Sequence, residues 1–224
     1  MLLPISGVLK ADELALVRSW LAAARFVDGR LSAGAAARRV KNNQELEDGA
    51  ADLERLNRVV MGNLVRHPAY RAGALPLHAA SPLYVRYRPG MAYGDHLDDP
   101  IMGADGVQYR SDIAVTIFLN APHEYDGGEL VVRTSSGDQV VKSAAGDAVL
   151  YPAGNIHHVS PVTRGERLVA VTWVQSLVRD AGQRELLYGL NAAREKLLQS
   201  APEATETAQV NAAYLNLIRM WSDL

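Results

Sequence analysis

The chain has 224 residues, a formal net charge of −2 at pH 7 and no cysteine. This length allows one large domain or two small ones with a sizeable core. The near-zero charge gives no reason to expect nucleic acid or an anionic membrane as a partner, and the lack of cysteine excludes disulfides and thiolate metal sites. No apolar run approaches the about 18 residues that a membrane helix needs, and Pro4 and Gly7 interrupt the N-terminus too early for a signal peptide. We therefore expect a cytoplasmic globular protein without a membrane partner.

The N-terminal part of the chain is predicted to be helical. Apolar residues recur at three- and four-residue steps over 11–26 and again over 48–66, where Pro68 follows the second run. An alanine- and arginine-rich segment over 33–41 stands between them. We expect all three to form a helical layer packed on a core.

The central part of the chain changes to short β-rich runs separated by Gly, Pro and Asp turns. The predicted strands are 83–88, 113–119, 129–133, 139–142, 148–151, 157–161 and 168–175. Many short strands at this spacing favour a sandwich or barrel over βαβ units. A jelly roll of about eight strands suits the length.

Helical periodicity returns near the C-terminus. One helix is predicted over 180–199 with Asp180 as its N-cap, and another over 203–222. The second helix carries an apolar stripe that could support a homodimer or pack on the outer face of the chain's own sheet, and we favour the latter. The stripe consists of Val210, Tyr214, Leu217, Ile218 and Trp221.

The predicted fold class is therefore α+β, with a jelly-roll core and helices on either side of it in the sequence. We divide the chain into an N-terminal helical segment 1–78, a core 79–176 and a C-terminal helical segment 177–224. All three are expected to belong to one folding unit.

A metal-binding pattern lies in the stretch Tyr93–Pro100. His96 and Asp98 stand two residues apart, and on extended backbone both side chains project from the same side of the chain. A third ligand can come from the pair His157 and His158, which point to opposite faces of a strand, and we choose His157 as the inward one. Two imidazoles and one carboxylate form the ligand set of non-haem Fe(II) oxygenases.

Arg167 opens an otherwise apolar predicted strand. A buried charge without a partner is costly, so this side chain requires an anion. It could pair at the barrel rim with Glu129, Glu166 or Asp147. It could instead point into the barrel and offer two parallel hydrogen bonds to the carboxylate of a ligand.

Several motifs together resemble the prolyl-hydroxylase-like Fe(II)/2-oxoglutarate dioxygenases. The first half of their signature matches Tyr87, Gly90, Tyr93, His96 and Asp98. The second half resembles segments 126–130, 146–152 and 157–167. Segments 40–44 and 173–179 are similar to parts of the bacterial PKHD-type hydroxylases, so the resemblance extends over nearly the whole chain.

This resemblance implies a double-stranded β-helix that binds Fe(II) through His96, Asp98 and His157. It implies 2-oxoglutarate as co-substrate, with Arg167 as the partner of its distal carboxylate. Tyr87 is implied as a second contact of that carboxylate, although it could equally be a core aromatic residue. No catalytic residue beyond the metal site is implied.

The implied reaction is hydroxylation of a small-molecule or peptide substrate by O₂, with decarboxylation of 2-oxoglutarate to succinate and CO₂. Ascorbate (vitamin C) is expected to support this activity. The residues do not name the substrate.

Segment 99–111 follows Asp98 directly and contains two glycines without a strand pattern. It is either a mobile lid over the substrate or an ordinary surface loop.

Two other classes of function remain open from the residues alone. The same ligands could hold Zn²⁺ or Mn²⁺ in a cupin-like hydrolase or isomerase, or the histidines could be structural in a non-enzymatic jelly-roll binding protein. Affinity for 2-oxoglutarate that depends on Arg167 would distinguish the oxygenase from the hydrolase or isomerase. A lack of metal in anaerobically purified protein, with no binding restored by added Fe(II), would favour the binding protein.

Overall fold

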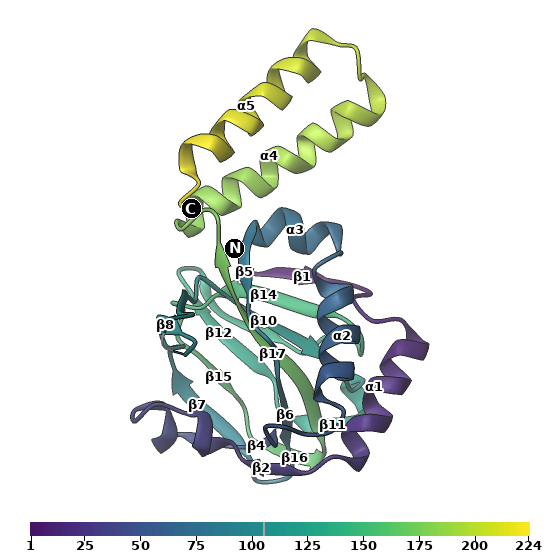
Figure 1. The fold of residues 1–224 in the computed structure, drawn as a ribbon, viewed down its shortest axis with the longest axis vertical. Helices are drawn as coiled ribbons and strands as arrows, with labels where there is room; N and C mark the ends of the chain where they lie inside the picture. The colour runs from purple at the N-terminus through teal and green to yellow at the C-terminus, as the bar shows by residue number, and fades with distance from the viewer. Residues whose placement is uncertain (105) are drawn as a thin grey trace.

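Two antiparallel sheets face each other across an apolar interior in the computed structural model, which describes residues 1–104 and 106–224 (Figure 1). The larger sheet has the spatial order β1 (Leu3–Ile5), β14 (Ala148–Pro152), β10 (Ile113–Phe118), β17 (Arg167–Ser176), β6 (Leu83–Tyr87), β4 (Gln44–Leu46) and β2 (Phe26–Asp28), with β5 (Pro76–Ala79) also paired to β17. The smaller sheet has the order β13 (Gly137–Val141), β12 (Leu130–Thr134), β15 (His157–Val159), β7 (Ala92–His96) and β3 (Lys41–Asn42). Two-stranded ribbons pair β11 (Tyr125–Gly127) with β16 (Val162–Gly165), and β8 (Ile101–Met102) with β9 (Tyr109–Arg110).

The central strands of the larger sheet are buried on both faces. On β10, Ile113, Val115 and Ile117 face a helical layer, whereas Ala114 and Phe118 face the smaller sheet. A strand that is covered on both sides reads as a continuous apolar run, which is why β10, β14 and β17 were predictable from the sequence. The inner faces of both sheets form the apolar wall around the site described below.

Helices α1 (Ala11–Ala23) and α2 (Leu53–Leu64) cover the outer face of the larger sheet (Figure 1). Val17 and Leu21 of α1 and Leu56 of α2 are buried against it. The predicted helical layer is therefore present, with shorter helices than expected.

The predicted helix over 33–41 is wrong. This part of the chain holds only two short 3₁₀ turns, η1 (Gly29–Ser32) and η2 (Ala37–Arg39), before β3 begins. Residues 33–40 are mostly exposed. Alanine propensity alone does not maintain a short helix that has no apolar face to bury.

The first 78 residues are also less purely helical than expected, because they contribute strands to both sheets. β1, β2, β4 and β5 join the larger sheet and β3 joins the smaller one. A third helix, α3 (Pro68–Ala74), begins with proline at its first position and has the His67 side chain as the acceptor that caps it. The division of the chain at residues 78 and 176 stays a prediction.

Helices α4 (Ala181–Ser200) and α5 (Thr205–Trp221) form a hairpin that extends away from the β core (Figure 1). Asp180 accepts a hydrogen bond from the Gln183 N–H at 2.8 Å, which confirms the predicted N-cap. The predicted packing of the α5 stripe on the outer face of the sheet is wrong. Tyr214 instead packs with Leu187 of α4 and Val178, and Leu217, Ile218 and Trp221 are partly buried in the same cluster, so the stripe packs within the hairpin and at its attachment point.

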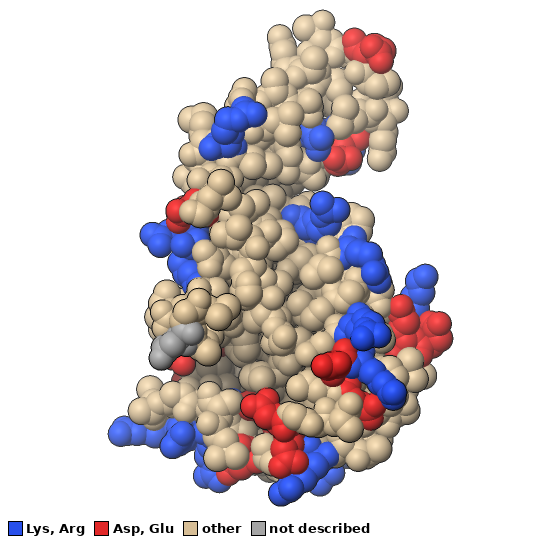
Figure 2. All heavy atoms as spheres, in the orientation of Figure 1, with Lys and Arg blue, Asp and Glu red and all other residues tan. Residues whose placement is uncertain are grey.

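Within residues 1–104 and 106–224, no helix combines the length and apolar character needed to cross a membrane. Basic and acidic side chains are interspersed over the face seen in Figure 2.

Candidate active site

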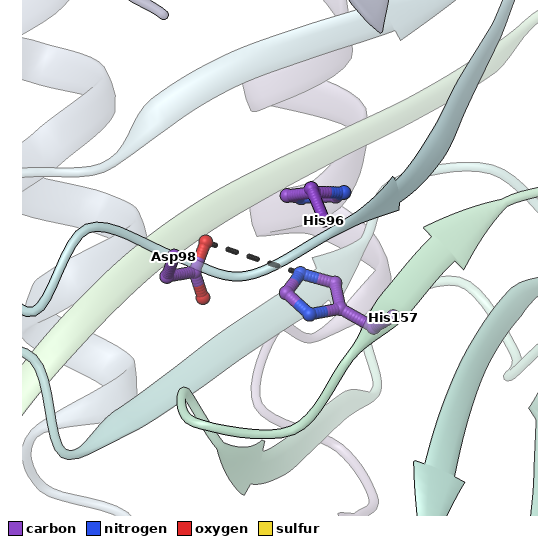
Figure 3. Close-up of side chains that lie close together, drawn as sticks. All are labelled: His96, Asp98 and His157. Carbon is purple, nitrogen blue, oxygen red and sulfur yellow. Dashed lines mark ion pairs between the residues drawn. The ribbon is translucent and has the colours of Figure 1, made fainter. Parts of the chain in front are cut away.

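Three side chains meet at one end of the smaller sheet, where the sequence predicted a metal site (Figure 3). His96 ends β7 and His157 begins β15, and the two residues are paired directly across these antiparallel strands. Asp98 follows two residues after His96, and its Oδ1 lies 3.9 Å from Nε2 of His157. One nitrogen or oxygen atom from each residue lies within 4.8 Å of the other two. This spacing suits a single shared metal ion.

Backbone carbonyls fix the orientation of both histidine rings. Nδ1 of His96 lies 2.8 Å from the Gly94 carbonyl oxygen, and Nδ1 of His157 lies 2.9 Å from that of Asn155. A carbonyl can only accept, so each Nδ1 carries the proton and each Nε2 keeps a free lone pair. Burial, aided by the nearby His157, lowers the pKa of His96 to about 3, which keeps the ring neutral as a metal ligand must be.

Asp98 is buried beside these rings with one oxygen atom unpartnered. Its side chain is 8% exposed, and within the described residues its Oδ2 has no hydrogen-bond partner. Burial raises the pKa of Asp98, whereas the nearby His157 opposes that rise. A buried carboxylate oxygen without a partner is costly, and a bound cation would satisfy it. The three residues therefore fit a divalent metal ion.

The neighbouring histidine and aspartate point away from this cluster. His158 lies on the opposite face of β15, where its Nδ1 is 2.9 Å from Oδ1 of Asp95. Asp95 also pairs with Arg133. His157 is thus the inward-facing histidine, as predicted.

Arg167 is buried at the start of β17, and no described residue provides an anionic partner for it. Its exposed fraction is 2%. Among the described residues, no Asp or Glu oxygen lies within 4.0 Å of it, and its Nε has no hydrogen-bond partner. The guanidinium carbon lies 5.1 Å from the ring centre of Tyr87 and 5.8 Å from that of Phe118. These rings stabilise the cation without neutralising it.

The predicted rim partners of Arg167 are engaged elsewhere. Glu129 pairs with Lys142, and Glu166 pairs with Arg88. Asp147 accepts the N–H of Gly7. Pairing at the rim therefore does not account for the buried guanidinium.

Tyr87 lies directly opposite Arg167 in the β6–β17 register. The residue is 3% exposed, and its hydroxyl accepts a hydrogen bond from Nδ2 of Asn43 at 3.0 Å. Burial raises the pKa of Tyr87, so the phenol keeps its proton.

A cavity of about 390 Å³ joins all five predicted site residues, because His96, Asp98, His157, Arg167 and Tyr87 all contribute to its wall. Sequence reasoning missed several polar and aromatic residues that also line it. They include Lys41, Asn43, Glu45, Thr116, Tyr151 and Trp173. The resemblance of segment 40–44 to the PKHD-type hydroxylases was the one signal that could have indicated the first two.

Lys41 and Glu45 form a buried ion pair in this wall, with Nζ 2.5 Å from Oε1 and both side chains 7% exposed. Lys41 belongs to β3 of the smaller sheet, and Glu45 belongs to β4 of the larger one. The pair therefore spans the point where the chain passes from one sheet to the other, at Asn43.

The predicted lid segment 99–111 borders the same cavity. It contains the β8–β9 ribbon, and Ile101, Met102 and Gly103 line the cavity. Asp105, within the predicted lid segment, lies outside the described residues. The segment forms part of the cavity wall, and its opening and closing stay a prediction.

Solved structures share this architecture. A prolyl hydroxylase from Trichoplax adhaerens, in complex with a peptide fragment of hypoxia inducible factor, aligns with a TM-score of 0.56 at 17% identity, over 83% of this chain and 86% of that one. A prolyl-4-hydroxylase from Pseudomonas putida aligns with a TM-score of 0.51 at 22% identity, over 78% and 92%. These likenesses show the fold and confirm the predicted jelly-roll core. The class of the 2-oxoglutarate- and Fe(II)-dependent oxygenases follows from the sequence, because the model of the 2OG-Fe(II) oxygenase superfamily matches the segment that forms this fold and site, residues 82–175.

The sequence itself gives the narrower assignment. The model of the 2OG-Fe(II) oxygenase superfamily matches residues 82–175, and that of the PKHD-type hydroxylase C-terminal domain matches 181–223. A PKHD-type hydroxylase of Thioalkalivibrio sulfidiphilus is 49% identical over 224 residues, and one of Acaryochloris marina is 45% identical over 223 residues, each over 100% of both chains. The chain belongs to the PKHD-type hydroxylases of the 2OG-Fe(II) oxygenase superfamily.

This membership confirms the predicted family and the predicted enzyme class. The chain is an oxidoreductase of the dioxygenase type, and its family uses Fe(II) and 2-oxoglutarate. A hydrolase, an isomerase or a non-enzymatic binding protein on the same fold is thereby set aside.

Proposed function

We propose that this enzyme hydroxylates a substrate while it converts 2-oxoglutarate and O₂ into succinate and CO₂. His96 and His157 bind Fe(II) through Nε2, and Asp98 binds it through its carboxylate. This assignment is supported by the mutual distances, the protonated Nδ1 atoms and the unpartnered Asp98 oxygen. Bound iron supplies the O₂ chemistry, and the surrounding residues orient the reactants and exclude water.

The unpaired Arg167 is the observation that carries the proposal. A buried guanidinium without a carboxylate among the described residues is costly, and an anionic ligand would satisfy it. Arg167 shares the wall of one cavity with His96, Asp98 and His157. A 2-oxo acid at the iron with a second carboxylate at Arg167 satisfies both ends. A mono-acid would leave the guanidinium unpaired, so the site discriminates in favour of the dicarboxylate.

Tyr87 provides a second donor to that distal carboxylate. It lies beside Arg167 in the cavity wall and keeps its proton because burial raises its pKa. A phenol that donates to a carboxylate adds a charge-assisted hydrogen bond to the ion pair.

The remaining part of the cavity wall is the proposed binding surface for the substrate. Ile101, Met102, Trp173 and Leu83 give this wall apolar surface, while the Lys41–Glu45 pair provides polarity. Both a small molecule and a peptide side chain are compatible with such a wall. Solved structures of the same fold include one with a peptide fragment and another, HygX from Streptomyces hygroscopicus, with hygromycin B. Support of the activity by ascorbate, the absence of a nucleic-acid or membrane partner and a homodimer through the C-terminal helices stay predictions.

The test is succinate formation by Fe(II)-loaded protein supplied with 2-oxoglutarate. We expect succinate only when Fe(II), 2-oxoglutarate and O₂ are all present. Asp98→Ala should lose both iron binding and succinate formation, because it removes the only anionic ligand of the proposed set. The matched control is Asp95→Ala, whose carboxylate lies on the opposite face of the sheet with His158 and Arg133. Full iron binding and turnover in Asp98→Ala would show that the ligand assignment is wrong.

The substrate can then be sought with a panel of metabolites and peptides. Acceleration of succinate formation together with a product that has gained one oxygen atom, detected by mass spectrometry, identifies it.

A further inference from the structure

Asn43 is a buried polar residue that contacts the proposed co-substrate site through Tyr87. It is 4% exposed, lines the cavity and lies where the chain passes from β3 to β4. Its Nδ2 donates to the Tyr87 hydroxyl at 3.0 Å. No other side-chain hydrogen bond of Tyr87 is formed with the described residues.

This contact determines where the phenolic proton of Tyr87 can go. The Tyr87 oxygen already accepts from the amide of Asn43, so its own proton must be donated elsewhere. Burial raises the pKa of Tyr87, so the proton is retained. Tyr87 lies in the cavity wall together with Arg167. It is therefore available as a donor toward an anion that binds there.

Gly29 fixes the place of the Asn43 carboxamide. The Gly29 N–H donates to the backbone carbonyl of Asn43 at 3.0 Å. A methyl group at position 29 would collide with the Oδ1 of Asn43 and lie 3.0 Å from its Cγ. Gly29 is not among the glycines with positive φ, so its backbone conformation is open to alanine. The missing side chain thus serves to make room for the carboxamide.

We propose that Asn43 is a positioning residue for 2-oxoglutarate, which holds the Tyr87 hydroxyl as a donor toward the distal carboxylate beside Arg167. The inference rests on the proposed function and adds to it a residue that does not contact the iron. Holding the donor in place before binding reduces the ordering cost of binding, and this selectively benefits ligands that carry the distal carboxylate.

The test compares two ligands by isothermal titration calorimetry on Fe(II)-loaded protein without O₂. 2-Oxoglutarate has the distal carboxylate, whereas 2-oxovalerate has a methyl group in its place. We expect Asn43→Ala to weaken 2-oxoglutarate binding by about five- to tenfold, the size of one hydrogen bond, and to leave 2-oxovalerate binding nearly unchanged. Tyr87→Phe should show the same selective loss, and the addition of Asn43→Ala to Tyr87→Phe should add little, because the two residues act through one donor.

Gly29→Ala provides a second perturbation that leaves both polar groups in the chain. It should reproduce the selective loss by displacing the carboxamide, and it should have little further effect in the Asn43→Ala background, where the space is free. Equal weakening of both oxo acids in Asn43→Ala, or full additivity with Tyr87→Phe, would overturn the inference. Unchanged 2-oxoglutarate binding in Arg167→Ala would instead contradict the proposed function, so the two failures are distinguishable.

Discussion

Replacement of Arg167 by methionine separates the effect of this residue on folding stability from its effect on 2-oxoglutarate binding. The side chain is buried and without an acidic partner among the described residues, and its apolar stem packs near Gly128 and two aromatic rings. Methionine keeps much of that stem and removes the charge. We therefore expect little loss of stability in the absence of ligand and a large loss of 2-oxoglutarate binding.

The change in the stability of the ligand-free protein follows from two opposing contributions. A buried donor without a partner costs about 1–3 kcal/mol. Each of the two ring contacts contributes about 0.5–1 kcal/mol in return. Their removal together should change the free energy of unfolding of the ligand-free protein by between about −1 and +2 kcal/mol.

The effect on the ligand is larger because hydrogen bonds to charged groups contribute about 1.5–3 kcal/mol each. Loss of one or two such bonds raises the Kd for 2-oxoglutarate about 100-fold. At a ligand concentration of about 100 times the wild-type Kd, binding stabilises the wild type by about 2.7 kcal/mol but the variant by only about 0.4 kcal/mol.

Urea unfolding of Fe(II)-loaded protein without O₂, with and without 2-oxoglutarate, measures both quantities. Arg164→Met is the matched control, because Arg164 lies on the neighbouring ribbon with its side chain 58% exposed and paired with Asp126. It should keep the full stabilisation by 2-oxoglutarate. Undiminished stabilisation in Arg167→Met would refute the role of this residue, and a loss of more than about 3 kcal/mol without ligand would refute the assignment of its charge as unpaired.

Two further predictions concern the helical layer. Arg18 of α1 donates to both oxygens of Glu124, at 2.6 and 3.1 Å, and lowers the pKa of that carboxyl. The contribution of Glu124 to the free energy of unfolding is therefore present above the ordinary pKa of a glutamate and is lost as the pH falls through the lowered pKa. In urea unfolding at neutral pH, the wild type should be more stable than Glu124→Gln by less than about 1 kcal/mol, and this difference should fall to zero in acid. Leu56 of α2 is fully buried against the sheet, so Leu56→Ala should lower the free energy of unfolding by about 2–5 kcal/mol while iron binding by the folded protein stays intact. A loss under about 1 kcal/mol would contradict the packing of α2 on the sheet.

The central strands of the larger sheet were predictable because burial on both faces leaves an uninterrupted apolar run, whereas β1, β2, β4 and β5 of the same sheet were not predicted. The predicted strands 113–119 and 168–175 agree with β10 and β17 to within one residue at each end. β7 was not predicted as a strand, since its sequence Ala-Tyr-Gly-Asp-His contains residues that rarely favour one. It is extended because β15 and β3 pair with it on either side. Tertiary pairing, which no local pattern reveals, thus forms the strand that carries His96.

The apolar stripe of α5 illustrates a second limit of prediction from the sequence. The helical spacing predicted that the stripe packs against other apolar residues, and Tyr214 is indeed buried while Leu217, Ile218 and Trp221 are partly buried beside it. The spacing of apolar residues along a helix does not show which surface packs against them. The stripe of α5 packs against α4 rather than against the sheet. Likewise, His96, Asp98 and His157 were identifiable from spacing and resemblance, whereas Asn43 reaches the same cavity through a crossing between two sheets.

The distribution of unpaired polar atoms gives the site a physical signature that the sequence cannot show. Six buried side-chain atoms have no hydrogen-bond partner within the described residues. Four of them, Asn43 Oδ1, Asp98 Oδ2, Arg167 Nε and Trp173 Nε1, belong to residues that line the single cavity described above. Each such atom costs free energy, and a fold selected for stability alone would satisfy them or spread them at random. Their concentration around one cavity, with an anionic oxygen at Asp98 and a cation at Arg167, supports the proposal that this cavity holds a metal ion and an anionic ligand.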